Sequence, residues 1–285
     1  MTPTMISQHT RILIVLALLA VAASAAEEIP AFPGQAADYH GFVSHRFKFD
    51  DCDCIVVEPK VVAPGRPWIW RTEFFDHRPM ADLALLEKGF HVVHMVVGNS
   101  FGCPSAMKHF EAFHTELTGK YKLATKCVLE GFSRGGLYAY NFAAANPGKV
   151  AAIYGDAPVC DFKSWPGGKL KNLGTGAGSA GDWQGVLKCY GFASDDEAIA
   201  YKKNPVDNLK PLADARIPLI HVVGDADDVV PVAENTAVIE QRYKAIGGEI
   251  EVIHKPGVNH HPHSLDDPTP IVEFILKHTA VNDIK

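Results

Sequence analysis

Short apolar segments alternate with longer amphipathic segments along most of the chain. The apolar segments predict strands at residues 45–49, 54–58, 67–71, 91–97, 127–130, 150–154, 218–223 and 250–254. The amphipathic segments predict helices at residues 81–88, 106–118, 136–145, 232–246 and 270–277. The first two strands form an antiparallel hairpin across the Asp-rich turn 50–53, and the later strands alternate with helices. This pattern predicts an α/β fold with a mostly parallel central sheet and helices on both faces.

The alternation of strands and helices breaks down between residues 160 and 204. This segment holds a Gly-rich stretch at 174–181 and two short helical patterns around 183–190 and 195–201. Long connections inside a compact domain usually carry function or move. The sequence therefore predicts a cap-like insertion at about 160–204 within a single domain, since 285 residues suit one large core.

The first 25 residues have the pattern of a targeting segment. Arg11 precedes the apolar run 12–23, and Ala23-Ser24-Ala25 is a small-x-small cleavage pattern. The run is shorter than the about 20 residues that a membrane-spanning helix needs. We predict a signal peptide over residues 1–25, a secreted or periplasmic protein, and no membrane attachment after cleavage; an uncleaved anchor is the alternative.

The composition is that of an ordinary globular protein. Hydrophobic residues make up 47% of the chain and charged residues 21%, which excludes a disordered or polytopic membrane protein. The 33 acidic residues outnumber the 27 Lys and Arg, and no long basic run occurs, so we expect no nucleic-acid partner. Six cysteines could pair in an oxidising compartment, in a connectivity that the sequence leaves open: Cys52, Cys54, Cys103, Cys127, Cys160 and Cys189.

One motif places a serine on a sharp turn. The sequence Gly131-Phe132-Ser133-Arg134-Gly135-Gly136 directly follows a predicted strand and directly precedes a predicted helix. Glycines two residues before and two after Ser133 allow chain segments to approach where a Cβ would clash, and the turn raises the hydroxyl above the sheet. The helix N-terminus then offers free N–H groups beneath a reacting carbon. We interpret Ser133 as a nucleophile.

A serine nucleophile needs a base, and the base needs an acid that orients it. Both residue types follow predicted strands, at the carboxyl edge where open parallel sheets place their sites. The candidate acids are Asp156, Asp225, Asp227 and Asp228, and the candidate bases are His260, His261 and His263.

The order Ser, Asp, His along the chain is that of the α/β-hydrolase triad. Over most of its length the chain resembles an α/β-hydrolase of the esterase and prolyl-oligopeptidase type, which implies the α/β-hydrolase fold. The family acid commonly lies in a Gly-x-x-Asp-x-Val-Val-Pro-like loop, and this resemblance implies Asp227, after Gly224 and before Val229-Val230-Pro231. Asp156 occupies the position from which some family members supply the acid instead.

The same resemblance indicates the base. The family histidine lies three residues after a glycine in a short loop, which implies His260 after Gly257. His261 is the alternative base. The sequence therefore predicts a triad of Ser133, His260 and Asp227.

Two donors are needed to hold an oxyanion. We expect one to be the backbone N–H of Arg134, and the other to come from Arg71 or Thr72 in the loop after a predicted strand. The Gly-x-Ser-Arg-x-Gly sequence is similar to the elbow of glucuronoyl esterases, in which this arginine helps to hold the oxyanion. The alternative is a structural salt bridge from Arg134 to Glu73 or Asp156. The chain lacks the His-Gly-Gly-Gly motif of many lipases and esterases.

Metal binding is the rival interpretation of the late histidines. Their His-His-x-His spacing lies in a Pro-containing loop and lacks the helical i, i+4 spacing of zinc hydrolases, and a nucleophilic serine makes a metal unnecessary. We therefore expect no metal and no cofactor. Tryptophan side chains could stack on a sugar substrate: Trp68, Trp70, Trp165 and Trp183.

Together these features predict a secreted serine hydrolase. Its expected substrate is a carboxylic ester, either a small molecule or a carbohydrate ester, and a carbohydrate-linked ester is favoured. A small serine peptidase of the prolyl-oligopeptidase type is one alternative, and a non-catalytic binding module on the hydrolase fold is another.

Overall fold

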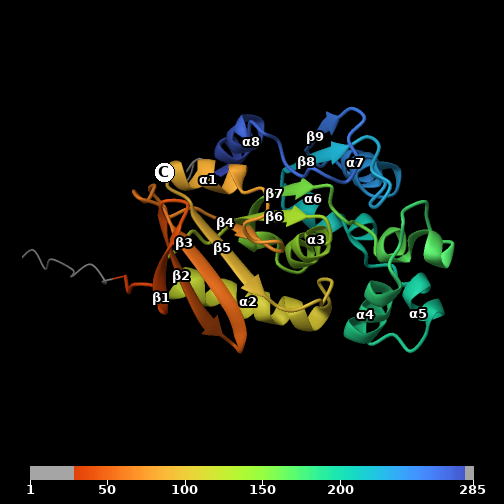
Figure 1. The fold of residues 1–285 in the computed structure, drawn as a ribbon, viewed down its shortest axis with the longest axis horizontal. Helices are drawn as coiled ribbons and strands as arrows, with labels where there is room; N and C mark the ends of the chain where they lie inside the picture. Colours follow the sequence, from red (N-terminus) through yellow and green to blue (C-terminus); the bar gives the residue numbers. More distant parts are fainter. Residues whose placement is uncertain (1–28, 280–285) are drawn as a thin grey trace, which may run out of the picture.

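The computed structural model describes residues 29–279. Within this range nine strands form one mixed sheet through the middle of the molecule, in the order β1-β2-β3-β5-β4-β6-β7-β8-β9 (Figure 1). The antiparallel end comprises β1 (Gln35–Tyr39), β2 (Phe42–Phe49) and β3 (Cys52–Glu58), and β3 pairs antiparallel with β5. The parallel part comprises β4 (Trp68–Arg71), β5 (His91–Val96), β6 (Cys127–Phe132), β7 (Val150–Asp156), β8 (Leu219–Gly224) and β9 (Ile250–Lys255).

Successive strand residues point into two different hydrophobic cores. In β6, Cys127 and Leu129 face one core and Val128 faces the other, because strand side chains alternate between the two faces. The first core lies under α2 (Pro104–Gly119), α3 (Gly135–Ala145), α6 (Lys210–Asp214) and α7 (Thr236–Ala245). The second lies under α1 (Met80–Glu87) and α8 (Thr269–Thr279), which lie side by side in Figure 1. Each fully buried aliphatic side chain in these cores contributes about 2 kcal/mol.

The predicted α/β architecture is confirmed, and two local details differ. Strand β1 is not among the predicted strands, because four of its five residues are exposed and carry no apolar alternation. The helix expected from residue 232 begins instead at Thr236, after a 3₁₀ turn at Val232–Glu234. Asn235 interrupts the helix there with a non-helical backbone, φ −121° and ψ −91°, and its Oδ1 accepts a hydrogen bond from the Cys160 N–H at 2.8 Å.

Residues 160–204 form a lobe at the end of the molecule toward which the arrowheads of β6 and β7 point (Figure 1). It contains α4 (Ala180–Tyr190) and α5 (Asp195–Ala200), joined by a 2.7 Å hydrogen bond from the Trp183 indole to Asp195. The Ala177 N–H donates to the Asp228 carbonyl at 3.0 Å, so the lobe contacts the loop that follows β8.

The predicted signal peptide, residues 1–25, lies outside the described range. Between residues 29 and 279 no helix has the length and apolar character needed to cross a bilayer. All six cysteines lie within this range, and each carries a free thiol.

Candidate active site

Ser133 occupies a strained turn between β6 and α3. Its φ of 47° lies in the left-handed region, which costs a non-glycine residue about 1–3 kcal/mol. Hydrogen bonds on both sides hold this conformation: the Ser133 N–H donates to the Asp156 carbonyl at 2.9 Å, and the Val159 N–H donates to the Ser133 carbonyl at 2.8 Å. The turn is therefore fixed against β7 and the segment that follows it.

The flanking glycines are required by close packing. A Cβ on Gly131 would lie 2.9 Å from the Gly135 carbonyl oxygen, and a Cβ on Gly135 would lie 3.0 Å from Thr72 Oγ1. The Ser133 turn can therefore form only with glycine at residue 131. It leaves almost no room for a side chain at residue 135.

Three side chains from three loops form a continuous chain of hydrogen bonds. Ser133 Oγ lies 3.0 Å from His260 Nε2, and His260 Nδ1 lies 2.7 Å from Asp227 Oδ2. His260 and Asp227 are buried, with 6% and 7% of their surface exposed. The structure thus brings together the three residues that the sequence indicated, in the arrangement by which an imidazole takes a serine proton and a carboxylate orients the imidazole.

Backbone and side-chain contacts hold the acid and the base in place. Asp227 Oδ1 accepts hydrogen bonds from the N–H groups of Val229 and Val230, at 3.0 and 2.8 Å, which leaves Oδ2 directed at His260. Asn259 joins the two loops, because its Oδ1 accepts from the His260 N–H at 2.6 Å and the Asp228 N–H at 3.2 Å. Asn259 is not among the residues indicated by the sequence, and its position directly before the histidine was the available signal.

Asp156, the alternative acid, has other partners. Its Oδ1 lies 2.7 Å from His263 Nδ1, while its Oδ2 accepts from the Tyr154 hydroxyl at 2.7 Å and the Ser264 N–H at 2.8 Å. Burial lowers the pKa of His263, and Asp156 opposes this effect. Asp156 therefore holds the loop beyond His260. His261, the alternative base, is exposed, and its ring centroid lies 5.0 Å from that of His260.

The Thr72 N–H and the Arg71 side chain, both expected near the oxyanion, have other partners. The Thr72 N–H donates to the Glu130 carbonyl at 3.0 Å, as a continuation of the β4–β6 pairing. The Arg71 guanidinium is fully buried and pairs with Asp82 at 2.5 Å and Glu130 at 3.2 Å. It also donates to the Phe74 carbonyl at 2.9 Å, so it stabilises the conformation of the loop after β4. Backbone pairing thus occupies the Thr72 N–H, and charge pairing, which the sequence could not show, occupies the Arg71 side chain.

Glu73 is the residue of this loop that lies beside the elbow. Its backbone nitrogen lies 3.7 Å from the position that a Cβ on Gly135 would occupy. Among residues 29–279, neither the Glu73 N–H nor the Arg134 N–H donates to another backbone or side-chain acceptor. Two free N–H groups thus flank the Ser133 turn.

The Arg134 side chain forms a salt bridge to Glu73, which is the alternative role that the sequence offered for it. Its Nε and Nη2 donate to Glu73 Oε2 at 3.1 and 3.0 Å. Burial raises the pKa of the Glu73 carboxyl, and the Arg134 charge opposes that rise. The guanidinium carbon also lies 5.1 Å from the centroid of the Phe74 ring, a cation–π contact.

The tryptophans provide little surface for a sugar. Trp68, Trp70 and Trp183 are at most 1% exposed and belong to the hydrophobic core. Trp165 alone among the four is partly exposed. The suggested stacking role is therefore wrong for three of the four side chains.

Comparisons with known proteins identify the fold. No family model matches the chain, and no curated protein sequence matches it. Among solved structures it is similar to dipeptidyl peptidase 4 of Porphyromonas gingivalis, with 15% identity, a TM-score of 0.60, and coverage of 85% of this chain and 36% of that one. It is also similar to Est1E of Butyrivibrio proteoclasticus, with 17% identity, a TM-score of 0.57, and coverage of 86% and 98%.

A third similar structure is a puromycin-hydrolyzing peptidase of Mycobacterium tuberculosis, with 13% identity, a TM-score of 0.58, and coverage of 79% of this chain and 36% of that one. The chain therefore spans about a third of the length of the two peptidases. These neighbours belong to the α/β-hydrolase superfamily, and the chain has the α/β-hydrolase fold, as the sequence predicted.

Proposed function

We propose that this protein is a serine hydrolase that cleaves carboxylic esters. The observation that carries the proposal is the unbroken hydrogen-bond chain from Ser133 Oγ through His260 to Asp227. A serine is a weak nucleophile at neutral pH, and a neighbouring imidazole that accepts its proton makes it reactive. The strained turn that presents Ser133 supports the same conclusion, because strain of this kind persists where function requires it.

In the proposed mechanism, His260 Nε2 takes the proton of Ser133 as Oγ attacks the ester carbonyl. Asp227 holds the imidazole in the tautomer with its free lone pair toward Ser133 and stabilises the imidazolium that forms. We assign the oxyanion to the backbone N–H groups of Arg134 and Glu73, which have no other acceptor among residues 29–279. His260 then protonates the leaving alcohol, and an attacking water, deprotonated by His260, releases the acid and restores Ser133.

A short acyl p-nitrophenyl ester and a fluorophosphonate probe test the nucleophile. We expect Ser133→Ala to keep its fold and to abolish both turnover and labelling, and peptide mass mapping of the wild type should find the probe on Ser133. Ser105→Ala, at an exposed serine near the start of α2, is the matched control. Labelling that survives in Ser133→Ala would refute the assignment, and no labelling of the wild type would favour a non-catalytic binding module.

The proposal also covers the kind of ester that the protein cleaves. The arginine beside the nucleophile, in a sequence similar to the elbow of glucuronoyl esterases, favours a carbohydrate-linked ester. Two of the similar structures are called peptidases, which favours peptide substrates as the alternative. Parallel assays with acetylated sugars, sugar uronate esters and peptide p-nitroanilides distinguish these classes by their kcat/KM values.

We also propose that the protein acts after export. The charged and apolar segments before the Ala23-Ser24-Ala25 pattern support this proposal. When the full chain is expressed with its leader in a bacterial host, the N-terminal sequence of the exported protein should begin at Ala26 or Glu27. A full-length protein retained in the membrane fraction would favour the uncleaved anchor.

A further inference from the structure

Three histidines meet beside the proposed triad without taking part in it. His77 belongs to the loop after β4, and His261 and His263 belong to the loop after β9. One ligand atom from each lies within 4.8 Å of the other two. We propose that His77, His261 and His263 form a binding site for one divalent transition-metal cation of the zinc type.

The arrangement of the three rings fits this role. The ring centroids are separated by 4.7 Å between His261 and His263, 5.7 Å between His77 and His263, and 6.2 Å between His77 and His261. Four-coordinate zinc with Zn–N bonds of about 2.0 Å places its nitrogen ligands about 3.3 Å apart. The atoms must therefore approach one another by at most about 1.5 Å. His77 and His261 are exposed, so rotation of their side chains can close that gap while the backbone stays in place.

His263 is already oriented for metal binding. It is 3% exposed, and its Nδ1 lies 2.7 Å from Asp156 Oδ1. Histidine ligands characteristically donate their other ring N–H to a carboxylate, which fixes the tautomer and increases the basicity of the coordinating nitrogen. Asp156 is itself held by the Tyr154 hydroxyl and the Ser264 N–H. The Asp156–His263 pair thus leaves Nε2 as the lone-pair donor.

The site leaves the triad intact. Both ring nitrogens of His260 have partners, Ser133 and Asp227, so His260 is not counted among the ligands. Its ring centroid nevertheless lies 4.8 Å from that of His263, which places a bound cation next to the base. The inference does not depend on the proposed function, because the three imidazoles can bind a cation whether or not Ser133 is a nucleophile. The sequence argued against a metal from the spacing of the late histidines and from the nucleophilic serine, and it could not show that the fold brings His77 beside His261 and His263.

Cobalt binding tests the site without any assay of activity. The purified full chain, stripped with EDTA, is titrated with Co²⁺ while the visible absorption of the ion is followed, and Zn²⁺ is then added as a competitor. We expect one Co²⁺ per chain, an intense four-coordinate spectrum, and displacement by one equivalent of Zn²⁺. His77→Ala and His261→Ala, both at exposed positions, should each weaken binding at least about 100-fold, and Asp156→Asn about 10- to 100-fold.

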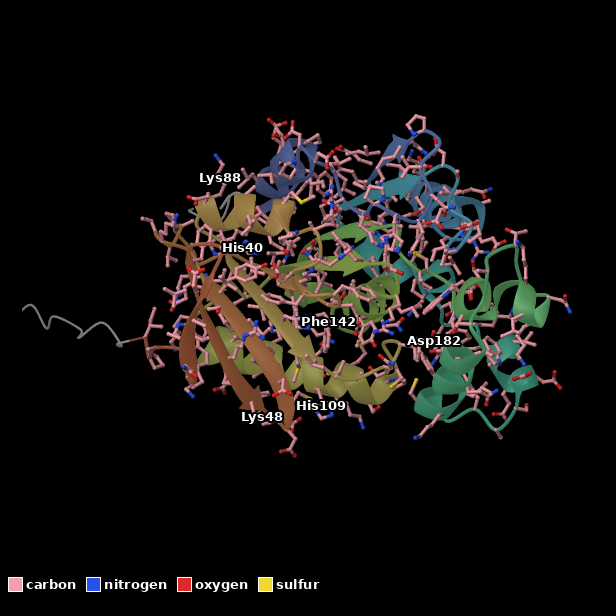
Figure 2. All side chains as sticks on the ribbon, viewed as in Figure 1. His40, Lys48, Lys88, His109, Phe142 and Asp182 are labelled. Carbon is pink, nitrogen blue, oxygen red and sulfur yellow. The ribbon has the colours of Figure 1, made fainter. Side chains whose placement is uncertain are left out.

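His109→Ala is the matched control. Figure 2 labels His109 close to Lys48, where α2 meets the β2–β3 hairpin, and its Nδ1 lies 2.5 Å from Asp50. This variant should bind Co²⁺ as the wild type does. Circular dichroism establishes that every variant is folded. Absence of the Co²⁺ spectrum in the wild type, or equal affinity in the wild type and the His77→Ala and His261→Ala variants, would overturn the proposal.

Discussion

Two nitrogens of Arg134 share a single oxygen of Glu73, with Nε 3.1 Å and Nη2 3.0 Å from Oε2. The pair joins the residue after the nucleophile to the loop after β4. Only 20% of the arginine side chain and 14% of the glutamate side chain are exposed, so water screens their attraction less than it would at the surface. The guanidinium is therefore occupied by the salt bridge, while the backbone N–H of Arg134 has no acceptor among residues 29–279.

This pairing predicts the effect of removing the Arg134 side chain. We expect Arg134→Gln to lower kcat/KM for a neutral ester less than about tenfold, since single oxyanion donors are worth about 100-fold or more and the backbone donor remains. A double-mutant cycle with Glu73→Gln, measured by urea unfolding, should give a coupling energy of about 1–2 kcal/mol. A 100-fold loss of kcat/KM in a stably folded Arg134→Gln variant would instead place the guanidinium on the reacting oxygen.

The two candidate acids predict opposite phenotypes. Asp227→Asn should lower kcat by about 10³- to 10⁴-fold with little loss of stability, because His260 loses the carboxylate that fixes its tautomer. Asp156→Asn should lower the free energy of unfolding by about 1–3 kcal/mol, since His263 and Ser264 lose a buried carboxylate, and should lower kcat less than tenfold. Ester kinetics and urea unfolding of both variants check this. The reverse pattern would identify Asp156 as the acid.

Most of the fold could be predicted because the central strands of its sheet are buried on both faces. Such strands read as continuous apolar runs, and β6 and β8 are buried at every position. Strand β1 could not be predicted in this way, because an exposed edge strand is defined by its backbone pairing with β2 and carries no apolar pattern.

Only those parts of the proposed site whose geometry depends on neighbouring residues in the sequence could be predicted. The glycines around Ser133 and the short loops ending in Asp227 and His260 are local signals. The roles of Arg71 and Glu73 depend on charges that meet across the fold, as Arg71 does with Asp82 and Glu130. The spacing of residues along the chain does not reveal such ion pairs.

The close packing around the Ser133 turn predicts that one added methyl group lowers the free energy of unfolding. In Gly131→Ala the new Cβ would lie 2.9 Å from the Gly135 carbonyl oxygen, so the backbone of the turn must shift. We expect a loss of about 1–3 kcal/mol in the free energy of unfolding, and a drop in ester turnover larger than unfolding explains. Gly119→Ala is the matched control, since nothing lies within 4 Å of its Cβ, and it should stabilise α2 by about 0.5–1 kcal/mol. Wild-type stability in Gly131→Ala would contradict the packing argument.

A buried histidine away from the triad should make stability depend on pH. His221 in β8 is fully buried, with its Nε2 2.7 Å from the Tyr140 hydroxyl and its Nδ1 2.9 Å from Thr236 Oγ1. Burial lowers the pKa of His221 to about 3. In the unfolded chain a histidine has its ordinary pKa of about 6.5. Between these values the unfolded chain binds one proton more than the folded chain, so this group favours unfolding increasingly as the pH falls.

Comparison with His221→Gln isolates this effect, because buried carboxyls such as Glu130, whose pKa is raised by burial, titrate in the opposite sense and cancel in the difference. Between pH 7.5 and pH 5.5 the wild type should lose about 1.4 kcal/mol of unfolding free energy relative to His221→Gln, as measured by urea titration at each pH. Tyr140→Phe, which removes a hydrogen-bond partner but keeps the imidazole, should shift stability by the same amount at both pH values. A pH-independent difference for His221→Gln would show that the folded protein protonates His221 as readily as the unfolded chain does.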